Sequence, residues 1–311
     1  MHRLLRDSPA EFAALIDASS SSRGIAREAI EKDYWAMEVL RSACGFSKDV
    51  HSLVFKGGTS LSKAFGLIHR FSEDIDLLVV SGESGAALKR TFRRLANHVS
   101  TELGLPYERE REGRGYLNAR FAYQGSEAPS FLSNGVLLEV GSRGGATPSE
   151  ARIVRSLLSE AASLVDPSIE EEFADLCQFS VNVLAPERTL AEKLAHLHHR
   201  AVIGDMDALR RGARHLYDVA MLLRSEDVLR ALSGGSIVDL MNDIDMRSAA
   251  AGWGFTSRPV EGFAASPAFR ATPRVVEAYE GGFDDLTELV WGDFPAVEEA
   301  LRIVSSRADL L

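Results

Sequence analysis

The stretch Phe55-Lys-Gly-Gly-Thr-Ser-Leu-Ser-Lys63, together with Arg70-Phe-Ser-Glu-Asp-Ile-Asp-Leu-Leu-Val-Val80, decides the fold of this chain. The apolar run Leu53–Phe55 predicts a strand, the two glycines predict a tight turn, and the apolar spacing from Leu61 onward predicts a helix. This order is typical of an α/β fold. The backbone N–H groups of the turn then lie at a helix N-terminus, where the helix dipole favours an anion such as a phosphate.

Asp74 and Asp76 stand at the beginning of a second predicted strand, which continues through Leu77–Val80. Residues i and i+2 of a strand face the same way, so we expect both carboxylates to project together while Ile75 faces the core. Two parallel carboxylates beside a phosphate-binding turn predict a Mg²⁺ site for phosphoryl or nucleotidyl transfer. A D-x-D pair or a glycine turn alone is usually a structural feature, but the two together on consecutive elements rarely arise by chance.

Glu139 interrupts the otherwise apolar run Val136–Val140, which predicts another strand. A carboxylate in such a run costs free energy unless it is paired or bound to a metal. An outward position on an edge strand explains this residue equally well, so two interpretations of Glu139 stay open.

Apolar spacing predicts the remaining elements: two helices within residues 8–43, a helix at 86–103, strands at 116–123 and 179–184, helices at 186–200 and 206–223, and a mainly helical tail. The loop Gly141–Ser149 marks the expected change of lobe, which predicts lobes of residues 1–148 and 149–311. Spacing alone makes Lys193 and Asp218 ordinary exposed charges, with Asp218 paired to Arg214 four residues earlier.

The composition is that of an ordinary soluble protein, with 311 residues and 45% apolar content. No apolar run reaches the roughly 18 residues that a membrane helix needs, and the N-terminus lacks a signal-peptide core. Cys44 and Cys177 are far apart and outside any C-x-x-C pattern. We therefore expect a cytoplasmic protein with reduced thiols and no membrane partner.

The net charge of −10 lies entirely in residues 151–311, because residues 1–150 hold equal numbers of basic and acidic side chains. This balance argues against nonspecific coating of nucleic acid, and a polyanionic substrate needs a local basic cleft. The candidates for that cleft are Arg200, Arg210, Arg211 and Arg214. Lys89, Arg90, Arg93 and Arg94 lie on the predicted helix 86–103, where a solvated basic face is favoured over a ridge that contacts RNA.

Lys56–Lys63 and Arg70–Leu77 resemble the nucleotidyltransferases of the AbiEii/MenT toxin group, which belong to the DNA polymerase β-like superfamily. The signature of that superfamily is a glycine turn followed by D-x-D. Three further stretches resemble the group, namely Ile30–Trp35, Glu192–Leu194 and Arg214–Asp218. The resemblance spans most of the chain. It implies a nucleotidyltransferase lobe with a small mixed sheet and a mainly helical C-terminal lobe, with the active site between them.

The resemblance also implies roles for individual residues. Asp74 and Asp76 are expected to be catalytic and to hold Mg²⁺, and Glu139 is the candidate third ligand, since this superfamily takes one from a neighbouring strand. Lys193 is expected to reach the triphosphate, and Asp218 to orient it or the acceptor hydroxyl. The implied nucleotide-binding residues are Lys56, Gly57, Gly58, Thr59, Ser60, Lys63 and Lys193.

The implied reaction is attack of an acceptor hydroxyl on the α-phosphate of a nucleoside triphosphate (NTP), with release of pyrophosphate. Resemblance to the MenT branch implies an RNA acceptor, the 3′ end of tRNA, and inhibition of translation. It also implies a cognate antitoxin protein. In some relatives the antitoxin phosphorylates a serine at the position of Ser72, where a phosphate would add about −1.5 to −2 charge beside the carboxylates.

Three alternatives stay open at the level of sequence. The same fold could transfer a nucleotide to a protein or to a small molecule, or it could be a catalytically inactive interaction module. The intact Asp74-x-Asp76 pair and Lys56-Gly57-Gly58 argue against the inactive module.

Overall fold

The computed structural model describes residues 3–46, 53–72, 74–123, 132–233 and 236–311. The chain divides into two compact units. The first comprises Met1–Ala64, Phe71–Ser142 and Ser149–Val183, and the second comprises Phe65–Arg70, Arg143–Pro148 and Leu184–Leu311. This division differs from the expected boundary between residues 148 and 149, because two strands that follow that boundary join the sheet of the first unit.

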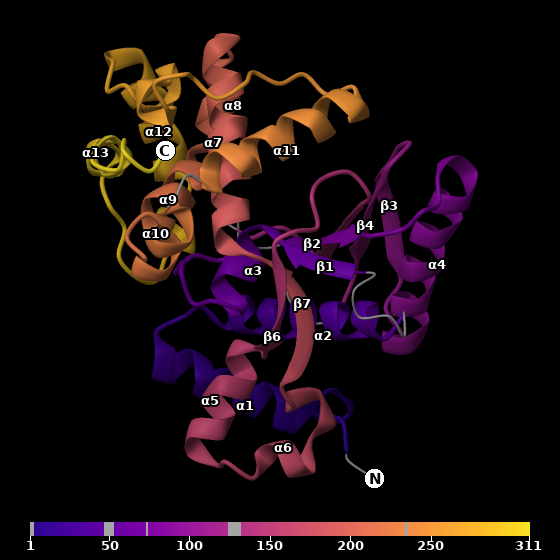
Figure 1. The fold of residues 1–311 in the computed structure, drawn as a ribbon. Helices are drawn as coiled ribbons and strands as arrows, with labels where there is room; N and C mark the ends of the chain where they lie inside the picture. Colours follow the sequence, from indigo (N-terminus) through magenta and orange to yellow (C-terminus); the bar gives the residue numbers. More distant parts are fainter. Residues whose placement is uncertain (1–2, 47–52, 73, 124–131, 234–235) are drawn as a thin grey trace. The chain divides into compact units, whose positions relative to one another are not determined.

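The first unit is built on a mixed sheet, in which the described residues form seven strands in the order β3-β4-β5-β2-β1-β7-β6. The strands are β1 (Leu53–Lys56), β2 (Asp74–Val79), β3 (Tyr107–Glu112), β4 (Tyr116–Phe121), β5 (Val136–Gly141), β6 (Ser149–Val154) and β7 (Phe179–Leu184). β1 is antiparallel to β2 and parallel to β7, and β2 is parallel to β5. β4 is antiparallel to both β3 and β5 (Figure 1). The predicted α/β class is confirmed.

Helices α2 and α4 cover the apolar face of this sheet. The helices of the first unit are α1 (Pro9–Arg23), α2 (Arg27–Gly45), α3 (Gly57–Lys63), α4 (Gly85–Leu103), α5 (Leu157–Val165) and α6 (Ile169–Glu172). Along β2, Ile75 and Leu77 are buried and alternate with the less buried Asp74 and Asp76, which confirms the predicted facing. α2 contacts β2 and β5 while α4 contacts β4, so both helices lie against the apolar side chains of the strands.

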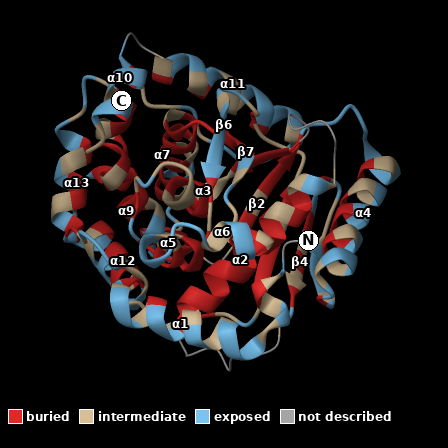
Figure 2. Ribbon diagram, turned by 90° about the horizontal axis from the view of Figure 1, so that it is seen from below, coloured by how far each residue is buried: buried red, intermediate tan, exposed pale blue. Residues whose placement is uncertain are grey.

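Helix α2 is buried along most of its length, and several of its buried residues are charged (Figure 2). Lys32 Nζ donates a hydrogen bond of 2.6 Å to the carbonyl oxygen of Ser133. Asp33 accepts a hydrogen bond of 2.5 Å from the backbone N–H of Leu157, at the beginning of α5. The same carboxylate forms an ion pair with Lys63, the last residue of α3. Both of these buried charges thus have a partner, and Asp33 joins three helices.

The second unit is helical in its described part. Its helices are α7 (Pro186–Val202), α8 (Met206–Arg211), α9 (Ala213–Leu222), α10 (Glu226–Leu232), α11 (Ser236–Ala251), α12 (Pro273–Asp284) and α13 (Val297–Ser305). The single helix predicted over 206–223 is wrong, because α8 and α9 meet at Gly212. A Cβ at Gly212 would lie only 3.0 Å from Leu197 Cδ2, so this position accepts no larger residue without a shift. No helix in the described ranges is long and apolar enough to cross a membrane.

Strands β3 and β6 are not predicted by the sequence pattern, and both lie at the edges of the sheet. β3 reads Tyr-Glu-Arg-Glu-Arg-Glu, and the middle four residues of β6 are exposed. Charged residues on an edge strand discourage pairing with other chains. The Glu-Arg sequence of β3 therefore lacks the alternation of apolar and polar residues from which a strand is predicted.

Replacing Asp33 with alanine is expected to lower the free energy of unfolding by about 3–5 kcal/mol, because it removes one partner of a buried ion pair. The side chains of Asp33 and Lys63 are each only 6% exposed. The matched control is Asp17→Ala, since the ion pair of Asp17 with Arg27 is exposed on both sides and should contribute less than about 1 kcal/mol. Chemical denaturation measures both variants, and equal losses of stability would contradict the assigned role of Asp33.

Candidate active site

Helix α3 begins at the residue after β1 ends, so the predicted glycine turn is the first turn of the helix. Gly57 has a φ of +80°, a backbone conformation that residues other than glycine rarely adopt. A Cβ at this position would also overlap the carboxylate of Asp76. Glycine is therefore required at position 57 by the backbone and by the close approach of Asp76.

The hydroxyl groups of this helix tie it to the D-x-D strand. Thr59 Oγ1 donates a hydrogen bond of 2.7 Å to the carbonyl oxygen of Asp74, and Ser60 Oγ donates one of 2.9 Å to that of Gly57. The side chains of Thr59 and Ser60 are buried, and so is the preceding residue Gly58. Thr59 and Ser60 thus hold the predicted phosphate turn in place beside Asp74.

Polar residues form a row across four strands of the sheet. Lys56 on β1 lies opposite Asp76 on β2, Asp76 lies opposite Glu139 on β5, and Glu139 lies opposite Asn118 on β4. Directly opposed residues of neighbouring strands share a face of the sheet. Asp74, two residues from Asp76, shares the same face. We name Lys56, Asp74, Asp76, Glu139 and Asn118 the carboxylate row. Because β5 lies between β2 and β4, the interpretation of Glu139 as an edge-strand residue is wrong.

The carboxylates of this row repel one another. Burial, and then the charge and hydrogen bond of Asp76, raise the pKa of Glu139 to about 7. The side-chain amide of Asn118 donates to Glu139 and opposes part of this rise. Among the described residues, no group of three or more His, Cys, Asp and Glu side chains is arranged to hold a metal ion. The metal-binding roles of Asp74, Asp76 and Glu139 therefore stay predictions.

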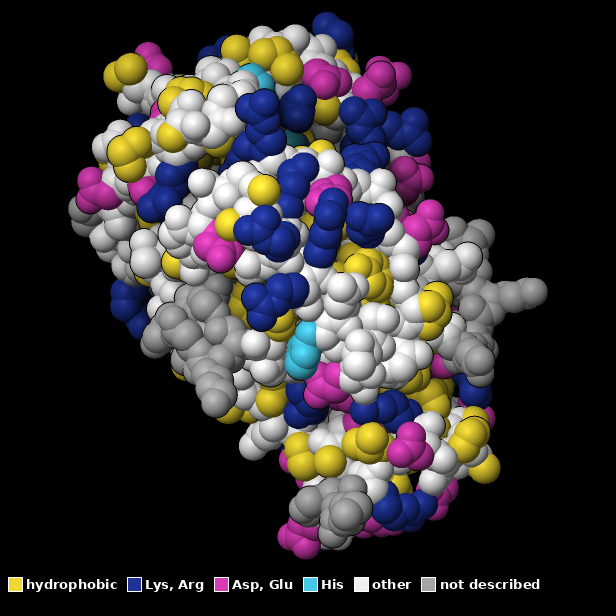
Figure 3. Space-filling model, turned by 90° about the vertical axis from the view of Figure 1, so that its right-hand side faces the viewer, with side chains coloured by type: hydrophobic (Ala, Val, Ile, Leu, Met, Phe, Trp, Pro, Cys, Tyr) yellow, Lys and Arg dark blue, Asp and Glu magenta, His cyan; other side chains and the backbone are white. Residues whose placement is uncertain are grey.

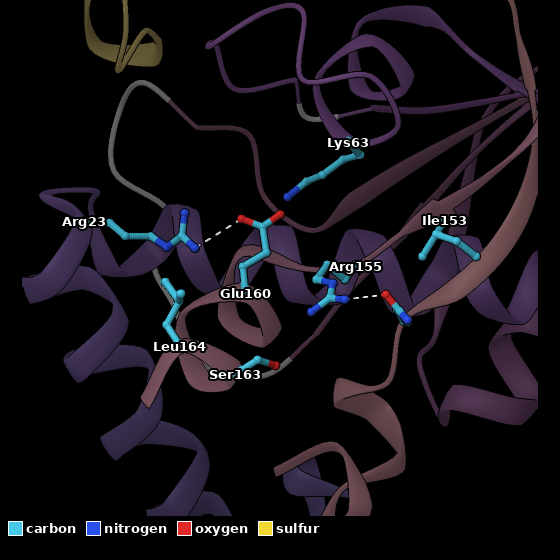
Figure 4. Close-up of a pocket in the computed structure, with 8 residues that line it drawn as sticks. Arg23, Lys63, Ile153, Arg155, Glu160, Ser163 and Leu164 are labelled. Atoms are coloured by element: carbon cyan, nitrogen blue, oxygen red, sulfur yellow. Dashed lines mark hydrogen bonds and ion pairs between the residues drawn. The ribbon is translucent and has the colours of Figure 1, made fainter. Parts of the chain in front are cut away.

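Lys63 lies away from the carboxylate row, at the opposite end of α3. Its side chain lines a cavity of about 520 Å³ together with Arg23, Arg155 and Glu160 (Figure 4). Glu160 forms an ion pair of 3.1 Å with Arg23, and Lys63 forms its own pair with Asp33. These basic groups thus have acidic partners, and Lys63 stabilises the turn helix through Asp33.

In the second unit, Asp218 binds two cations. Arg70 donates to both of its carboxylate oxygens, from Nε at 2.7 Å and from Nη2 at 2.8 Å. Lys193 Nζ lies 2.8 Å from Asp218 Oδ2 and 3.2 Å from Nδ1 of His215. Burial acts to raise the pKa of Asp218, but the charges of Arg70 and Lys193 outweigh burial and hold this pKa well below its usual range. Lys193 has a lowered pKa because of its burial.

The expectation that Lys193 and Asp218 are exposed charges is wrong. Lys193 is 7% exposed and Asp218 is fully buried. Asp218 pairs with Arg70 and Lys193 instead of with Arg214, which is exposed. Arg70 opens the second quoted segment, and its role was not predicted. The sequence signal for it is the position of an arginine four residues before Asp74 of the D-x-D motif.

Comparison with known proteins shows the family to which this chain belongs. The sequence profile of "Nucleotidyl transferase AbiEii toxin, Type IV TA system" matches residues 38–300. No curated protein matches the chain. MenT4, a nucleotidyltransferase toxin from Mycobacterium tuberculosis H37Rv, is 20% identical, with 94% of this chain and 98% of that chain covered and a TM-score of 0.41. JHP933 from Helicobacter pylori is 14% identical, with 92% and 95% covered and a TM-score of 0.39. Because both TM-scores are low, the family assignment rests on the profile.

Asp218→Asn is expected to destabilise the protein by about 3–5 kcal/mol, because it leaves two cations buried without an anion. Lys193→Met should cost clearly less, since the pair between Arg70 and Asp218 stays intact. Thermal and chemical denaturation of both variants measure the difference. A Lys193→Met variant that is as unstable as Asp218→Asn would contradict this account of the cluster.

Glu139→Gln is expected to raise the melting temperature of the metal-free protein at pH 8. The pKa of Glu139 is about 7 in the folded protein, against about 4.3 when unfolded, so its ionisation opposes folding as pH rises through 7. As pH falls from 7 towards 4.3 the gain should shrink, and below about 4.3, where Glu139 is protonated in both the folded and the unfolded protein, it should vanish. Scanning calorimetry in the presence of a chelator measures the change in melting temperature at each pH. The control is Glu108→Gln, which changes an exposed residue on β3. A loss of stability at pH 8 would contradict repulsion within the carboxylate row.

Proposed function

Because this chain belongs to the AbiEii family of nucleotidyl transferase toxins, we propose that it transfers a nucleotide from an NTP to an RNA acceptor. The proposed target is the 3′ end of tRNA, and the proposed result is inhibited translation. A cognate antitoxin is the proposed partner, and the cytoplasm is the proposed place of action. The observation that carries the transferase chemistry is the close approach of Asp76 to Gly57, in register with Glu139.

Mg²⁺ is the proposed cofactor, with Asp74 and Asp76 as ligands and Glu139 as the candidate third ligand. Carboxylate oxygens are ligands that Mg²⁺ prefers. The raised pKa of Glu139 supports this proposal, because it reflects burial and, after burial, the negative charge of Asp76 and Asp74, which a divalent cation would offset. The chemistry that such an ion supplies is alignment of the phosphates and compensation of their charge.

In the proposed reaction, the oxygen of the acceptor hydroxyl forms a bond to the α-phosphorus while the bond from the α-phosphorus to the bridging oxygen breaks. Pyrophosphate leaves, and the hydroxyl proton passes to solvent or to a carboxylate of the row. We assign the backbone N–H groups of Gly57 and Gly58 to the phosphates, as the helix dipole favours. Lys56 is assigned as a further residue that binds the same triphosphate. Thr59, Ser60 and Lys63 act by holding the turn, because their side chains are engaged within it or with Asp33.

Lys193 is the proposed ligand of the triphosphate from the second unit, with Asp218 orienting it. An ammonium group has three N–H donors. Asp218 and His215 engage two of them, which leaves one for a phosphate oxygen. The bidentate bond from Arg70 holds Asp218 in place and so restricts the position of Lys193.

Ser72 is the proposed regulatory site. Its carbonyl oxygen accepts a hydrogen bond of 3.3 Å from Thr59 Oγ1, so the residue lies where α3 meets the beginning of β2. Phosphorylation by an antitoxin would add about −1.5 to −2 charge near Asp74, which opposes binding of a triphosphate.

Radiolabelled NTPs, offered one at a time with purified protein, total tRNA and a bacterial protein extract, test the proposal. We expect label on tRNA, and Asp74→Asn or Asp76→Asn should each reduce transfer at least about 100-fold, because several kcal/mol of charge compensation is lost. Asp17→Asn, an exposed change in the same unit, should leave the rate unchanged.

Each outcome of this experiment decides between the open alternatives. Label on a protein or on a small molecule would show that this molecule, and not RNA, is the acceptor. The absence of label with every NTP would favour a catalytically inactive module. Transfer at the normal rate by either aspartate variant would contradict the assigned site. Because Lys193→Met should fold better than Asp218→Asn, it is the cleaner variant for testing the second unit.

A further inference from the structure

The carboxylate row continues beyond Asn118 to the edge of the sheet. Asn118 on β4 lies opposite Arg111 on β3, so Arg111 shares the face that carries Asp76 and Glu139. The opposite face of β4 is closed, because Leu117, Ala119 and Phe121 are buried where α4 contacts this strand.

Tyr116 presents an aromatic ring on this face. It lies two residues before Asn118 on β4, so the two side chains point the same way. Tyr116 is 43% exposed. The ring lies against the backbone of Gly113, where a Cβ would overlap it, and the residue opposite on β5 is Gly141. Glycine on both sides supports the ring and leaves it open to a ligand.

Two cations belong to the same hairpin: Arg111 lies on β3, and Arg114 lies in the turn between β3 and β4. Arg111 and Arg114 are both exposed, and neither takes part in an ion pair among the residues that the structure describes. A register shift between Arg109 and Arg111 turns these two arginines to opposite faces, with Arg109 opposite the buried Ala119. Arg109 forms an ion pair of 3.5 Å with Glu112. Figure 3 faces the side of Figure 1 on which β3 and α4 lie, and Lys and Arg side chains gather on it.

We propose that Tyr116, Arg111 and Arg114, which we name the hairpin platform, bind a single-stranded segment of the RNA acceptor near its 3′ end. A base stacks on Tyr116, and the two arginines contact phosphates. Bases of any kind stack on an aromatic ring, and a basic surface beside it follows the backbone. The choice of RNA as ligand rests on the proposed function, whereas the platform itself rests on the geometry of β3 and β4.

The spacing of the sheet suits this role. Strands lie about 5 Å apart and residues rise about 3.3 Å along a strand, which puts the backbone of Tyr116 within roughly 10 Å of that of Glu139. That distance is on the scale of one or two nucleotides. A base held on Tyr116 thus leaves the terminal hydroxyl within reach of the carboxylate row, which is the positioning that group transfer needs.

The test uses the full chain and a fluorescein-labelled single-stranded RNA of eight nucleotides with a free 3′ hydroxyl. Fluorescence anisotropy at several salt concentrations gives the affinity. Tyr116→Ala should weaken binding about 10-fold, and Tyr116→Phe should restore it, because stacking needs only the ring. Arg111→Glu should weaken binding and lower the salt slope by about 0.7 for each phosphate that the variant no longer binds. Arg109→Glu, the same charge change two residues away on the other face, should bind as wild type does.

A second measurement separates the acceptor from the NTP. Binding of a fluorescent NTP analogue should be unchanged in Tyr116→Ala, while the KM for RNA in the transfer reaction rises and kcat stays the same. If Tyr116→Ala weakens NTP binding instead, or if Arg109→Glu weakens RNA binding as much as Arg111→Glu, the platform is not an acceptor site. The same conclusion follows if wild type labels RNA and Tyr116→Ala does so with an unchanged KM.

Failure of the proposed function looks different from failure of the platform. Wild type that labels a protein or a small molecule, and does not bind the RNA, would remove the acceptor class and the platform with it. Wild type that labels RNA, with variants that bind normally, would remove the platform alone. All substituted side chains are exposed, so a melting temperature close to that of wild type is expected for each variant and shows that the fold is kept.

Discussion

The carboxylate of Asp76 occupies space beside Gly57 that any side chain at position 57 would fill. This close approach is possible because β1 and β2 are antiparallel neighbours, with Lys56 opposite Asp76, and because the helix begins at the next residue. The glycine turn and the D-x-D pair are therefore one assembly. Thr59 completes it with a hydrogen bond to the backbone of Asp74. The carboxylate row and the hairpin platform take their positions from the same sheet.

Two groups of charged side chains, one in each unit, differ in how their charges are compensated. In the second unit, Asp218 is compensated by both Arg70 and Lys193, which keeps its carboxylate ionised. In the first unit, Glu139 adjoins further carboxylates and holds its proton up to about neutral pH. A compensated cluster keeps its geometry without a ligand, whereas repelling carboxylates gain stability when a cation arrives. The second arrangement fits the proposed Mg²⁺ site, and it costs stability while no cation offsets the carboxylate charges.

Much of the central motif could be predicted from local pattern. The period of two along a strand predicted that Asp74 and Asp76 face together and that Ile75 faces the core, and the burial along β2 confirms it. The edge strand β3 could not be predicted, because its Glu-Arg alternation carries no apolar signal. The pairing of β3 with β4 places Arg111 on the face that carries the carboxylate row. This pairing depends on a register shift between Arg109 and Arg111, which the amino-acid composition does not predict. The break between α8 and α9 was missed because Gly212 is required by a neighbouring helix.

The sequence by itself determined the elements whose signal is local: the strand, glycine turn, helix and D-x-D strand, and through them the family. Only the tertiary structure decided which charges are buried and with what partners. Lys193 and Asp218 look like surface residues because spacing along a helix reports only its own faces. Their burial depends on Arg70, which lies 148 residues before Asp218 in the chain. A pairing over that separation is chosen by packing and by the free-energy cost of leaving a buried charge alone, and neither is encoded in a local pattern.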